Sequence, residues 1–466
     1  MKKITFLTTL LFITLFSACD STSNKAKYIF YFIGDGMGLA QSVLTENYLD
    51  VLDSDTATVH LDFHKMPVTG FSTTYSANSL VTCSSAAGTA LSTGRKTNNG
   101  MLGVTPDTIP LVSIAKILKE QGYKIGIISS VSIDHATPAA FYAHSASRND
   151  YLDISKSIPE TNYDYFGGGG LLGAKKDKDI YQYIRERGYT VTNDKNIIDN
   201  HKPEDGKLYA YSKHLSSAED IPYYIDEPKY EMRLPYFLNK AIELFSKNND
   251  KFFIMVEGGK IDWSCHGNDP ATTLFEVIDF NDAYKVAYDF YLKHPEETLI
   301  VMTADHETGG LSIGQKSTHY NNFPALLKYQ KVSEDKFNIT IDEITSTKPT
   351  LDDIIKLMED NFGFNNQEKG MALNKKDSTM IDIVYQKKFM SDKISSDQIE
   401  KYDIRSKETL ASIALRIMSE KAGIGWTTND HSGIAVPVRA IGAGSEKFAG
   451  FYDNTDIPKY ILKIAE

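Results

Sequence analysis

"FIGDGMG", residues 32–38, marks the point where the first strongly apolar stretch of the chain ends. The stretch itself, YIFYFI at residues 28–33, has the length and the aromatic and β-branched composition of a buried strand. It stops at Asp35, which stands between Gly34 and Gly36. A carboxylate directly after a buried strand is expected at the carboxyl edge of a sheet, where open α/β folds bind their ligands. Taken alone, Gly-Asp-Gly favours a plain strand-to-helix turn in which Asp35 caps the next helix.

Other strand-like and helix-like segments alternate along the chain. The strand-like runs are residues 124–128, 252–256, 298–302 and 436–441, and the helical patterns between them include residues 111–120 and 273–292. This alternation predicts an α/β fold with a mostly parallel central β-sheet and helices on both faces. A more polar segment, approximately residues 312–425, lies between two groups of candidate ligands and is predicted to be an insertion.

Length and charge limit the classes of function. A chain of 466 residues exceeds the size at which one core stops growing, so we expect one large domain with an insertion, or two domains. A formal net charge of −11 and a pI near 5.5, without a basic run, argue against nucleic-acid binding. The glycine-rich stretch at residues 166–173 lacks the Lys-Ser/Thr of a phosphate-binding loop and is interpreted as a turn.

The first residues have the pattern of an export signal. Two lysines precede an apolar stretch, residues 4–16, that is too short to span a bilayer, and Ser17-Ala18 then precede Cys19. A cysteine in this position resembles a bacterial lipoprotein processing site, although Phe16 stands where leucine is usual. We therefore expect a leader over residues 1–19, a tether over residues 20–27 and an exported protein that is periplasmic or on the cell surface, with lipidation of Cys19 or simple cleavage as the alternatives.

Metal-ligating side chains follow four of the predicted strands. The first strand leads to Asp35, the second to His135 and Thr137, the third to Glu257 and the fourth to Asp305 and His306. Convergent polar groups at a strand edge are a general signature of a binding site.

Three more candidate ligands lie elsewhere in the chain. Asp262 and His266 are four residues apart, so on a helix they would share one face and reach one metal. His431 precedes the last strand-like run. Mixed nitrogen and oxygen donors suit zinc, and an all-oxygen subset suits magnesium. Two such ions about 4 Å apart would form the two-metal clamp used for displacement at phosphorus.

Two segments offer a nucleophile and a phosphate-binding cation. Small residues in "VTCSSAAGTALSTGRKTNNG", residues 81–100, predict a helix that begins near Ser84 or Ser85. A hydroxyl there is either a helix cap or, beside a metal, a nucleophile on a helix N-terminus that attracts phosphate. Arg148 has the planar fork that binds two phosphate oxygens, or is ordinary exposed surface.

With these motifs in this order, from Gly34-Asp-Gly to His431-Ser-Gly, the chain resembles the alkaline phosphatases, metal-dependent phosphomonoesterases of bacteria and animals. The resemblance extends over the whole mature chain. It implies a single catalytic domain over residues 28–466, in which the insertion at approximately 312–425 forms a crown-like subdomain. It also implies a homodimer.

The resemblance further implies a role for each candidate residue. Ser84 would be the nucleophile and would form a phosphoserine intermediate, and Arg148 would bind the phosphate. Asp262, His266 and His431 would hold a first zinc ion. Asp305, His306 and Asp35 would hold a second zinc, and Asp35, Thr137 and Glu257 would hold a magnesium ion, with His135 beside it.

Three positions depart from the family pattern. Cys83 stands where the family has an aspartate that orients the arginine, which puts the position of Arg148 in question. His135 and Trp263 stand where the best-known bacterial members have Asp and Lys, so the metal preference of the third site is open. Apart from Cys19, the cysteines are Cys83 and Cys265; we expect free thiols, with a disulfide as the alternative.

The expected activity is therefore hydrolysis of small-molecule phosphate monoesters. The first alternative is an enzyme of the same superfamily that acts on diesters or sulfates. The second is a surface protein that binds phosphate or metal without catalysis.

Overall fold

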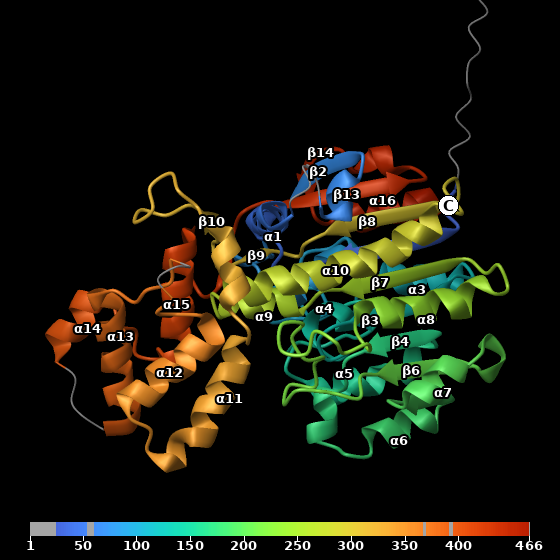
Figure 1. Cartoon of the computed structure of the whole chain (residues 1–466). Helices are drawn as coiled ribbons and strands as arrows, with labels where there is room; N and C mark the ends of the chain where they lie inside the picture. The colour runs from blue at the N-terminus through green and yellow to red at the C-terminus, as the bar shows by residue number, and fades with distance from the viewer. Residues whose placement is uncertain (1–24, 54–59, 367–369, 391–394, 466) are drawn as a thin grey trace, which may run out of the picture.

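The computed structural model describes residues 25–53, 60–366, 370–390 and 395–465. The predicted leader, Cys19 and most of the predicted tether lie outside these residues. At the centre is a ten-stranded sheet of order β14-β2-β13-β8-β1-β7-β3-β4-β6-β5 (Figure 1). Its strands are β1 (Tyr28–Ile33), β2 (Val68–Thr73), β3 (Lys124–Ser129), β4 (Tyr165–Gly168), β5 (Tyr189–Thr192), β6 (Lys207–Tyr211), β7 (Phe252–Glu257), β8 (Thr298–Thr303), β13 (Val436–Gly442) and β14 (Gly450–Asp453).

The sheet is mostly parallel, as predicted. Of the strand pairs that the structure describes in it, the two that involve β13 are antiparallel and the others are parallel. All six residues of β1 are buried, because side chains on both of its faces enter a core. Ile29 and Tyr31 belong to one core cluster, and Phe30 and Phe32 belong to the other.

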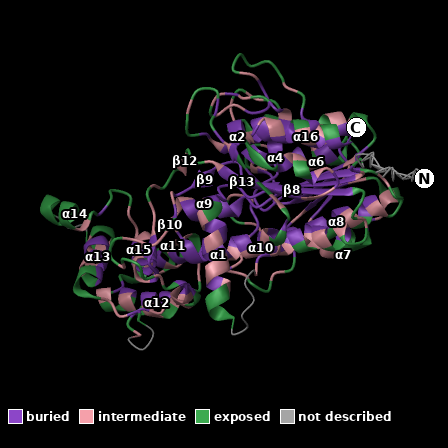
Figure 2. Cartoon of the chain, turned by 90° about the horizontal axis from the view of Figure 1, so that it is seen from above, coloured by how far each residue is buried: buried purple, intermediate pink, exposed green. Residues whose placement is uncertain are grey.

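Helices cover both faces of the sheet, again as predicted. The helices α3 (Ile114–Glu120) and α16 (Asp456–Ala465) supply residues to the core of Ile29 and Tyr31. The helices α8 (Leu234–Ser246) and α10 (Pro270–Tyr291) supply residues to the opposite core. Figure 2 shows the buried residues concentrated in the sheet and on the helix surfaces that pack against it.

A largely helical segment lies between two short strands, β10 (Ser312–Ile313) and β11 (Ile424–Gly425), which pair with each other. Figure 1 shows its helices to one side of the central sheet. A third core joins them to Leu44 of α1 (Leu39–Leu52) and to Leu274 of α10. The helices of the segment are α11 (Glu334–Ile344), α12 (Leu351–Phe362), α13 (Lys375–Tyr385), α14 (Ser396–Tyr402) and α15 (Leu410–Ala422).

The turn predicted over residues 166–173 is wrong at its start, because residues 165–168 form the buried strand β4. Glycine is required there by space: at Gly168, which has a φ of +124°, a Cβ would lie 1.9 Å from the Ser129 carbonyl oxygen of β3. Within the described ranges, no helix has both the length and the apolar character needed to cross a membrane.

Strand register brings the candidate ligands to one edge of the sheet. Ile33, the last residue of β1, is paired with Glu257 of β7 and with Thr303 of β8. Ser129, the last residue of β3, is also paired with Glu257. The segments that follow these parallel strands therefore leave the sheet side by side.

Candidate active site

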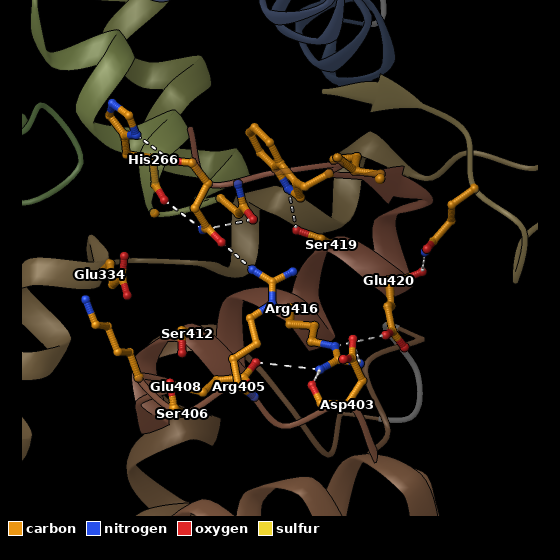
Figure 3. Close-up of a pocket in the computed structure, with 18 residues that line it drawn as sticks. His266, Glu334, Asp403, Arg405, Ser406, Glu408, Ser412, Arg416, Ser419 and Glu420 are labelled. Carbon is orange, nitrogen blue, oxygen red and sulfur yellow. Dashed lines mark hydrogen bonds and ion pairs between the residues drawn. The ribbon is translucent and has the colours of Figure 1, made fainter. Parts of the chain in front are cut away.

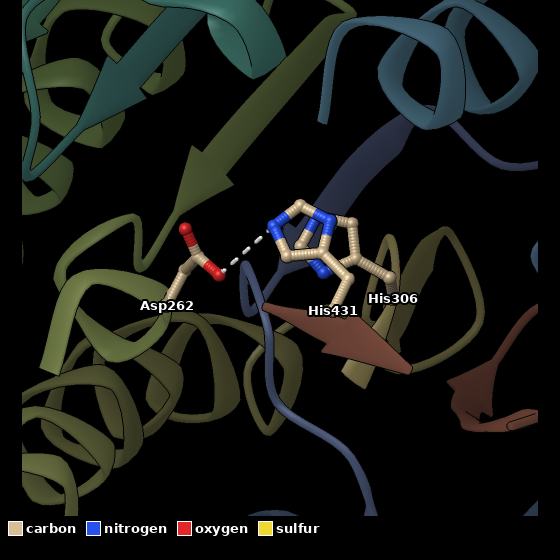
Figure 4. Close-up of side chains that lie close together, drawn as sticks. All are labelled: Asp262, His306 and His431. Carbon is tan, nitrogen blue, oxygen red and sulfur yellow. Dashed lines mark ion pairs between the residues drawn. The ribbon is translucent and has the colours of Figure 1, made fainter. Parts of the chain in front are cut away.

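The side chains at this edge form three overlapping groups that are able to hold metal ions. Within each group the ligand atoms lie within 4.8 Å of one another. Figure 4 shows the first group, to which a helix, a short strand and a loop contribute. The groups are Asp262, His306 and His431; Asp35, Asp305 and His306; and Asp35, His135 and Glu257.

His266 lies beside the first group, because the helix α9 (Lys260–His266) puts His266 one turn after Asp262. His266 Nε2 lies 3.3 Å from Asp262 Oδ2 and 3.2 Å from His431 Nε2. His431 reaches the group through a short ladder in which β12 (His431–Ser432) pairs with β9 (Glu307–Thr308). The three residues predicted for the first zinc therefore lie together.

The second and third groups share Asp35. In the second group, His306 Nε2 lies 3.4 Å from Asp35 Oδ1 and 3.2 Å from Asp305 Oδ2. On the other side of Asp35, Thr137 Oγ1 donates a hydrogen bond of 3.4 Å to Asp35 Oδ2. Thr137 is held there by the short helix α4 (Ala136–Ala139), which follows the strand β3. One carboxylate thus faces two candidate metal positions.

The electrostatics of these groups call for cations. Asp35, Asp305 and Glu257 are fully buried. Burial, and then the charge of neighbouring carboxylates, raises the pKa of Asp35 and of Asp305 well above the ordinary value. Burial likewise raises the pKa of Glu257 to about 7. Among the described residues, Asp35 Oδ1, Asp305 Oδ2 and Glu257 Oε1 accept no hydrogen bond. Buried carboxylate oxygens without a donor fit bound metal ions.

The imidazoles are suited to bind a metal in their neutral form. Burial, and then the positive charge of neighbours, lowers the pKa of His306 well below its ordinary value and lowers that of His135 to about 3. Burial alone would raise the pKa of Asp262, but the hydrogen bond and charge of His266 and the charges of the other two histidines lower it below the usual range. Neutral imidazole and ionised carboxylate are the forms that ligate metals.

Ser84 faces the ligand groups and Ser85 does not. The helix α2 (Ser84–Thr93) starts at Ser84, which is 2% exposed. Ser84 Oγ lies 3.3 Å from His306 Nε2, whereas Ser85 Oγ lies 3.2 Å from Cys83 Sγ. Consecutive residues of a helix project about 100° apart, so the two hydroxyls face different surroundings.

Arg148 lies beside His135 of the third group. Its guanidinium Nη2 is 3.1 Å from His135 Nε2, and its backbone N–H donates to the Gly100 carbonyl oxygen. The Gly100 N–H in turn donates to Cys83 Sγ, over 3.1 Å. Burial alone would raise the pKa of Cys83, but hydrogen bonds from Ser85 and from backbone N–H groups, with the charge of Arg148, lower it. Cys83 and Cys265 are both free thiols, as expected.

Several residues that orient the candidate ligands are not predicted from the sequence. The Thr308 hydroxyl donates to Asp262 Oδ1 and lies 3.2 Å from His306 Nδ1. His431 Nδ1 donates to the Thr82 carbonyl oxygen over 2.7 Å, and His266 Nδ1 donates to the Asn429 carbonyl oxygen. These hydrogen bonds leave Nε2 of both rings available to a metal. Thr308 stands two residues after His306, so the sequence shows a hydroxyl near this ligand. The two carbonyl acceptors have no sequence signal.

The family model described as alkaline phosphatase matches residues 26–466 of the chain. The chain belongs to the alkaline phosphatase family. It is 32% identical to alkaline phosphatase 3 of Bacillus subtilis over 94% of this chain and 89% of the relative. It is 30% identical to the Escherichia coli alkaline phosphatase over 62% of this chain and 71% of that one.

Solved structures of alkaline phosphatases have the same fold. A cold-active alkaline phosphatase from Shewanella sp. superposes with a TM-score of 0.77 at 27% identity, covering 94% of this chain and 100% of that one. The alkaline phosphatase of the Antarctic bacterium TAB5 has a TM-score of 0.65 at 25% identity, covering 95% and 98%. The predicted family and fold are confirmed, and the chain is a metal-binding phosphate-monoester hydrolase.

Proposed function

We propose that this alkaline phosphatase hydrolyses monoesters through a phosphoserine formed on Ser84. The observation that carries the proposal is the position of Ser84 Oγ, at the N-terminus of α2 and 3.3 Å from His306 Nε2 among the buried carboxylates. Ser84 Oγ loses its proton to solvent and attacks phosphorus, the bond to the leaving oxygen breaks, and that oxygen leaves with the electron pair and takes up a proton. Water then attacks the phosphoserine and releases inorganic phosphate, which restores the hydroxyl.

We also propose two zinc ions and one magnesium ion. The first zinc is assigned to Asp262, His266 and His431, the second to Asp305, His306 and Asp35, and the magnesium to Asp35, Thr137 and Glu257. When bound, the ions would supply positive charge that lowers the pKa of the serine and of water and stabilises the leaving oxygen. A histidine-to-glutamate variant of the TAB5 enzyme holds magnesium in its M3 site. In this chain His135 gives the third group a nitrogen donor.

Two parts of the chain bind the phosphoryl group in this proposal. The backbone N–H groups at the start of α2 would donate to a phosphoryl oxygen beside Ser84, and the helix dipole favours negative charge there. Arg148 binds two phosphoryl oxygens through its planar fork, at the cost of its contact with His135. Cys83 Sγ accepts a hydrogen bond from the Gly100 N–H, and the Gly100 carbonyl oxygen accepts one from the Arg148 N–H. Through Gly100, Cys83 takes the place of the family's aspartate in positioning Arg148.

Substrate preference tests the monoesterase assignment. The purified protein is assayed at alkaline pH with an aryl phosphate monoester, the matching diester and the aryl sulfate. We expect the monoester to have by far the largest kcat/KM, because one arginine and three metal positions match a dianionic terminal phosphoryl group. Preferred turnover of the diester or the sulfate would place the chain with the other activities of the superfamily.

Organisation and location are further proposals. We infer one catalytic domain over residues 28–466 with a crown-like insertion at approximately 312–425, a homodimer, and export with lipidation at Cys19. Light scattering of the purified protein tests the dimer. Mass spectrometry of the mature N-terminus tests lipidation, because an acylated Cys19 and a simply cleaved chain differ in mass.

A further inference from the structure

A cavity of about 620 Å³ lies beside the candidate metal centre, between it and the helical insertion. On one side its lining includes His266, Asn268 and Trp426. On the other side it includes Glu334 of α11 and residues 403–408, the connection between α14 and α15. Figure 3 shows His266 on one side and the charged residues of the insertion on the other.

The cations that line this cavity differ in whether a carboxylate lies near them. Arg416 lies within 4 Å of three carboxylates, at 3.8 Å from Asp403, 3.6 Å from Glu408 and 3.5 Å from Glu420. The guanidinium of Arg405 instead donates to the amide oxygen of Asn429. In the described part of the chain, no carboxylate lies within 4.0 Å of the side-chain nitrogens of Arg405 or Lys407.

Hydrogen bonds through Asn429 connect Arg405 to His266 of the candidate metal centre. Asn429 Nδ2 donates to the His266 carbonyl oxygen over 2.8 Å, and the Asn429 carbonyl oxygen accepts from His266 Nδ1. The cation of the insertion therefore lies next to the loop that holds a proposed ligand of the first zinc. Both Arg405 and Lys407 are exposed, so a molecule in the cavity has access to them.

Glu334 does not cancel these cations near neutral pH. Burial, and then the charge of Asp269, raises the pKa of Glu334 to about 8. At pH 7 this carboxyl is mostly protonated, so among the described lining residues Arg405 and Lys407 remain the cations without a carboxylate partner within 4.0 Å.

We propose that this cavity receives the leaving group of the substrate, and that Arg405 and Lys407 select leaving groups that carry an anionic substituent of their own, such as a carboxylate or a second phosphate. The inference rests on the proposed function, in which metal ions stabilise the leaving oxygen and His266 is one of the ligands assigned to them. A guanidinium and an ammonium without carboxylate partners attract such an anion and bind it through charge-assisted hydrogen bonds.

A pair of substrates whose leaving groups differ in charge tests the proposal. The probes are 4-carboxyphenyl phosphate and its carboxyl methyl ester, which has an uncharged leaving group, assayed at pH 7 on the metal-loaded enzyme. The quantity measured is the ratio of their kcat/KM values in wild type, Arg405→Gln, Lys407→Gln and the double variant. We expect each single variant to lower the ratio about fivefold and the double variant to lower it further, in the range of partly exposed charge pairs.

Two control variants accompany these. Lys401→Gln removes an exposed cation from α14 that does not line the cavity, and it should leave the ratio unchanged. Arg405→Lys keeps a cation at this position and should retain most of the wild-type ratio of kcat/KM values. Added salt should lower the wild-type ratio more than that of the double variant, because screening weakens the attraction.

The possible failures are distinguishable. Normal hydrolysis of the methyl ester with the same ratio in all variants would overturn anion selection and leave the proposed function intact. An equal loss on both probes in Arg405→Gln, with no effect of Lys407→Gln, would show that Arg405 only positions Asn429 and His266, and would also overturn it. If wild type hydrolyses neither probe, the proposed function and the inference both fall.

Discussion

Asp35 shows how much a single residue contributes to this site. Its carboxylate belongs to two of the three ligand groups, with His306 Nε2 at 3.4 Å from one oxygen and Thr137 Oγ1 at 3.4 Å from the other. It is fully buried, and one of its oxygens has no hydrogen-bond donor among the described residues. A carboxylate in this position is stable as an anion only with cations nearby.

The two adjacent serines at the start of α2 give a sharp test at the residue scale. We predict that Ser84→Ala lowers kcat by several orders of magnitude with metal content unchanged, because the loss falls on covalent catalysis. Ser85→Ala should cost little, since Ser85 Oγ contacts Cys83 instead. Steady-state kinetics and elemental analysis of both variants check this. Near-normal turnover in Ser84→Ala would move the nucleophile to another residue.

Thr308 is predicted to position two ligands without touching substrate. Its hydroxyl contacts Asp262 and His306, so Thr308→Val removes hydrogen bonds while keeping the volume. We expect about 10–100-fold weaker zinc binding, the usual cost of losing a partner that orients a ligand. Competition with a chromogenic chelator measures it. Thr308→Ser, which keeps the hydroxyl, should bind zinc nearly as wild type does; equal weakening in both variants would contradict the role.

The sequence locates most of these residues but not their surroundings. Asp35, Glu257 and Asp305 are predictable because each stands within two residues of the end of an apolar run. The carbonyl oxygens of Thr82 and Asn429 are not, because any residue type supplies a backbone acceptor and only the folded chain places it. Which of the two serines faces the ligand groups also depends on where α2 starts.

At the scale of elements, the turn after β1 has to be unusually close to α9. Gly36 has a φ of +71°, and a Cβ there would lie 2.8 Å from Asp262 Cα and 2.8 Å from Thr308 Oγ1. Because Gly36 has no side chain, the end of β1 can lie in contact with α9 and with the segment after β8. Without that approach, Asp35 and Asp262 would not serve neighbouring groups.

We predict that Gly36→Ala lowers zinc affinity and turnover, and that strain from the positive φ is only one of the causes. A positive φ costs a non-glycine residue about 1 kcal/mol, and here the Cβ would also push against the Asp262 backbone. Gly122→Ala is the matched control: its φ is +86° and a Cβ there meets nothing within 4 Å. Gly36→Ala should lose zinc affinity and most turnover, whereas Gly122→Ala should lose only stability in a thermal melt. Wild-type zinc affinity in Gly36→Ala would contradict this.

The elements that the sequence predicts well are those buried on both faces. The run at residues 28–33 is recognisable because every position is apolar, and it coincides with β1. The strands β4, β5 and β6 are short, and β4 contains two glycines, of which Gly168 packs closely against Ser129 of β3, so neither length nor composition indicates a strand at β4. Packing against neighbours decides these strands, and neighbours are not visible in one sequence.

At the scale of the whole molecule, the metal centre is also a stability element. The pKa of Glu257 is raised from 4.5 to about 7 without metal, so the metal-free protein loses stability as the pH rises from about 4.5 to 7 and the full loss is present above 7. Asp35 and Asp305, whose pKa values are also raised, act in the same direction. Bound cations would remove this loss by stabilising the charged carboxylates.

We therefore predict that the difference in Tm between metal-loaded and chelated protein widens by several degrees from pH 5 to pH 8. The lowered pKa of His135 has the opposite sign, because a buried neutral imidazole costs stability as the pH falls. That cost is present with and without metal, so it cancels in the difference. Differential scanning calorimetry of both forms measures the gap, and a gap that is constant or narrows with pH would contradict the electrostatic role of the cations.

The most direct test of the central claim is to map the phosphoenzyme. Wild-type enzyme is incubated with a phosphate monoester, quenched in acid and digested, and the phosphopeptide is sequenced by mass spectrometry. The residue that carries the phosphate identifies the nucleophile, with Ser84→Ala as the control that should yield no labelled peptide from residues 81–100. We predict one phosphate on Ser84. Phosphate on Ser85, or monoester turnover with no phosphoenzyme at any pH, would contradict the mechanism.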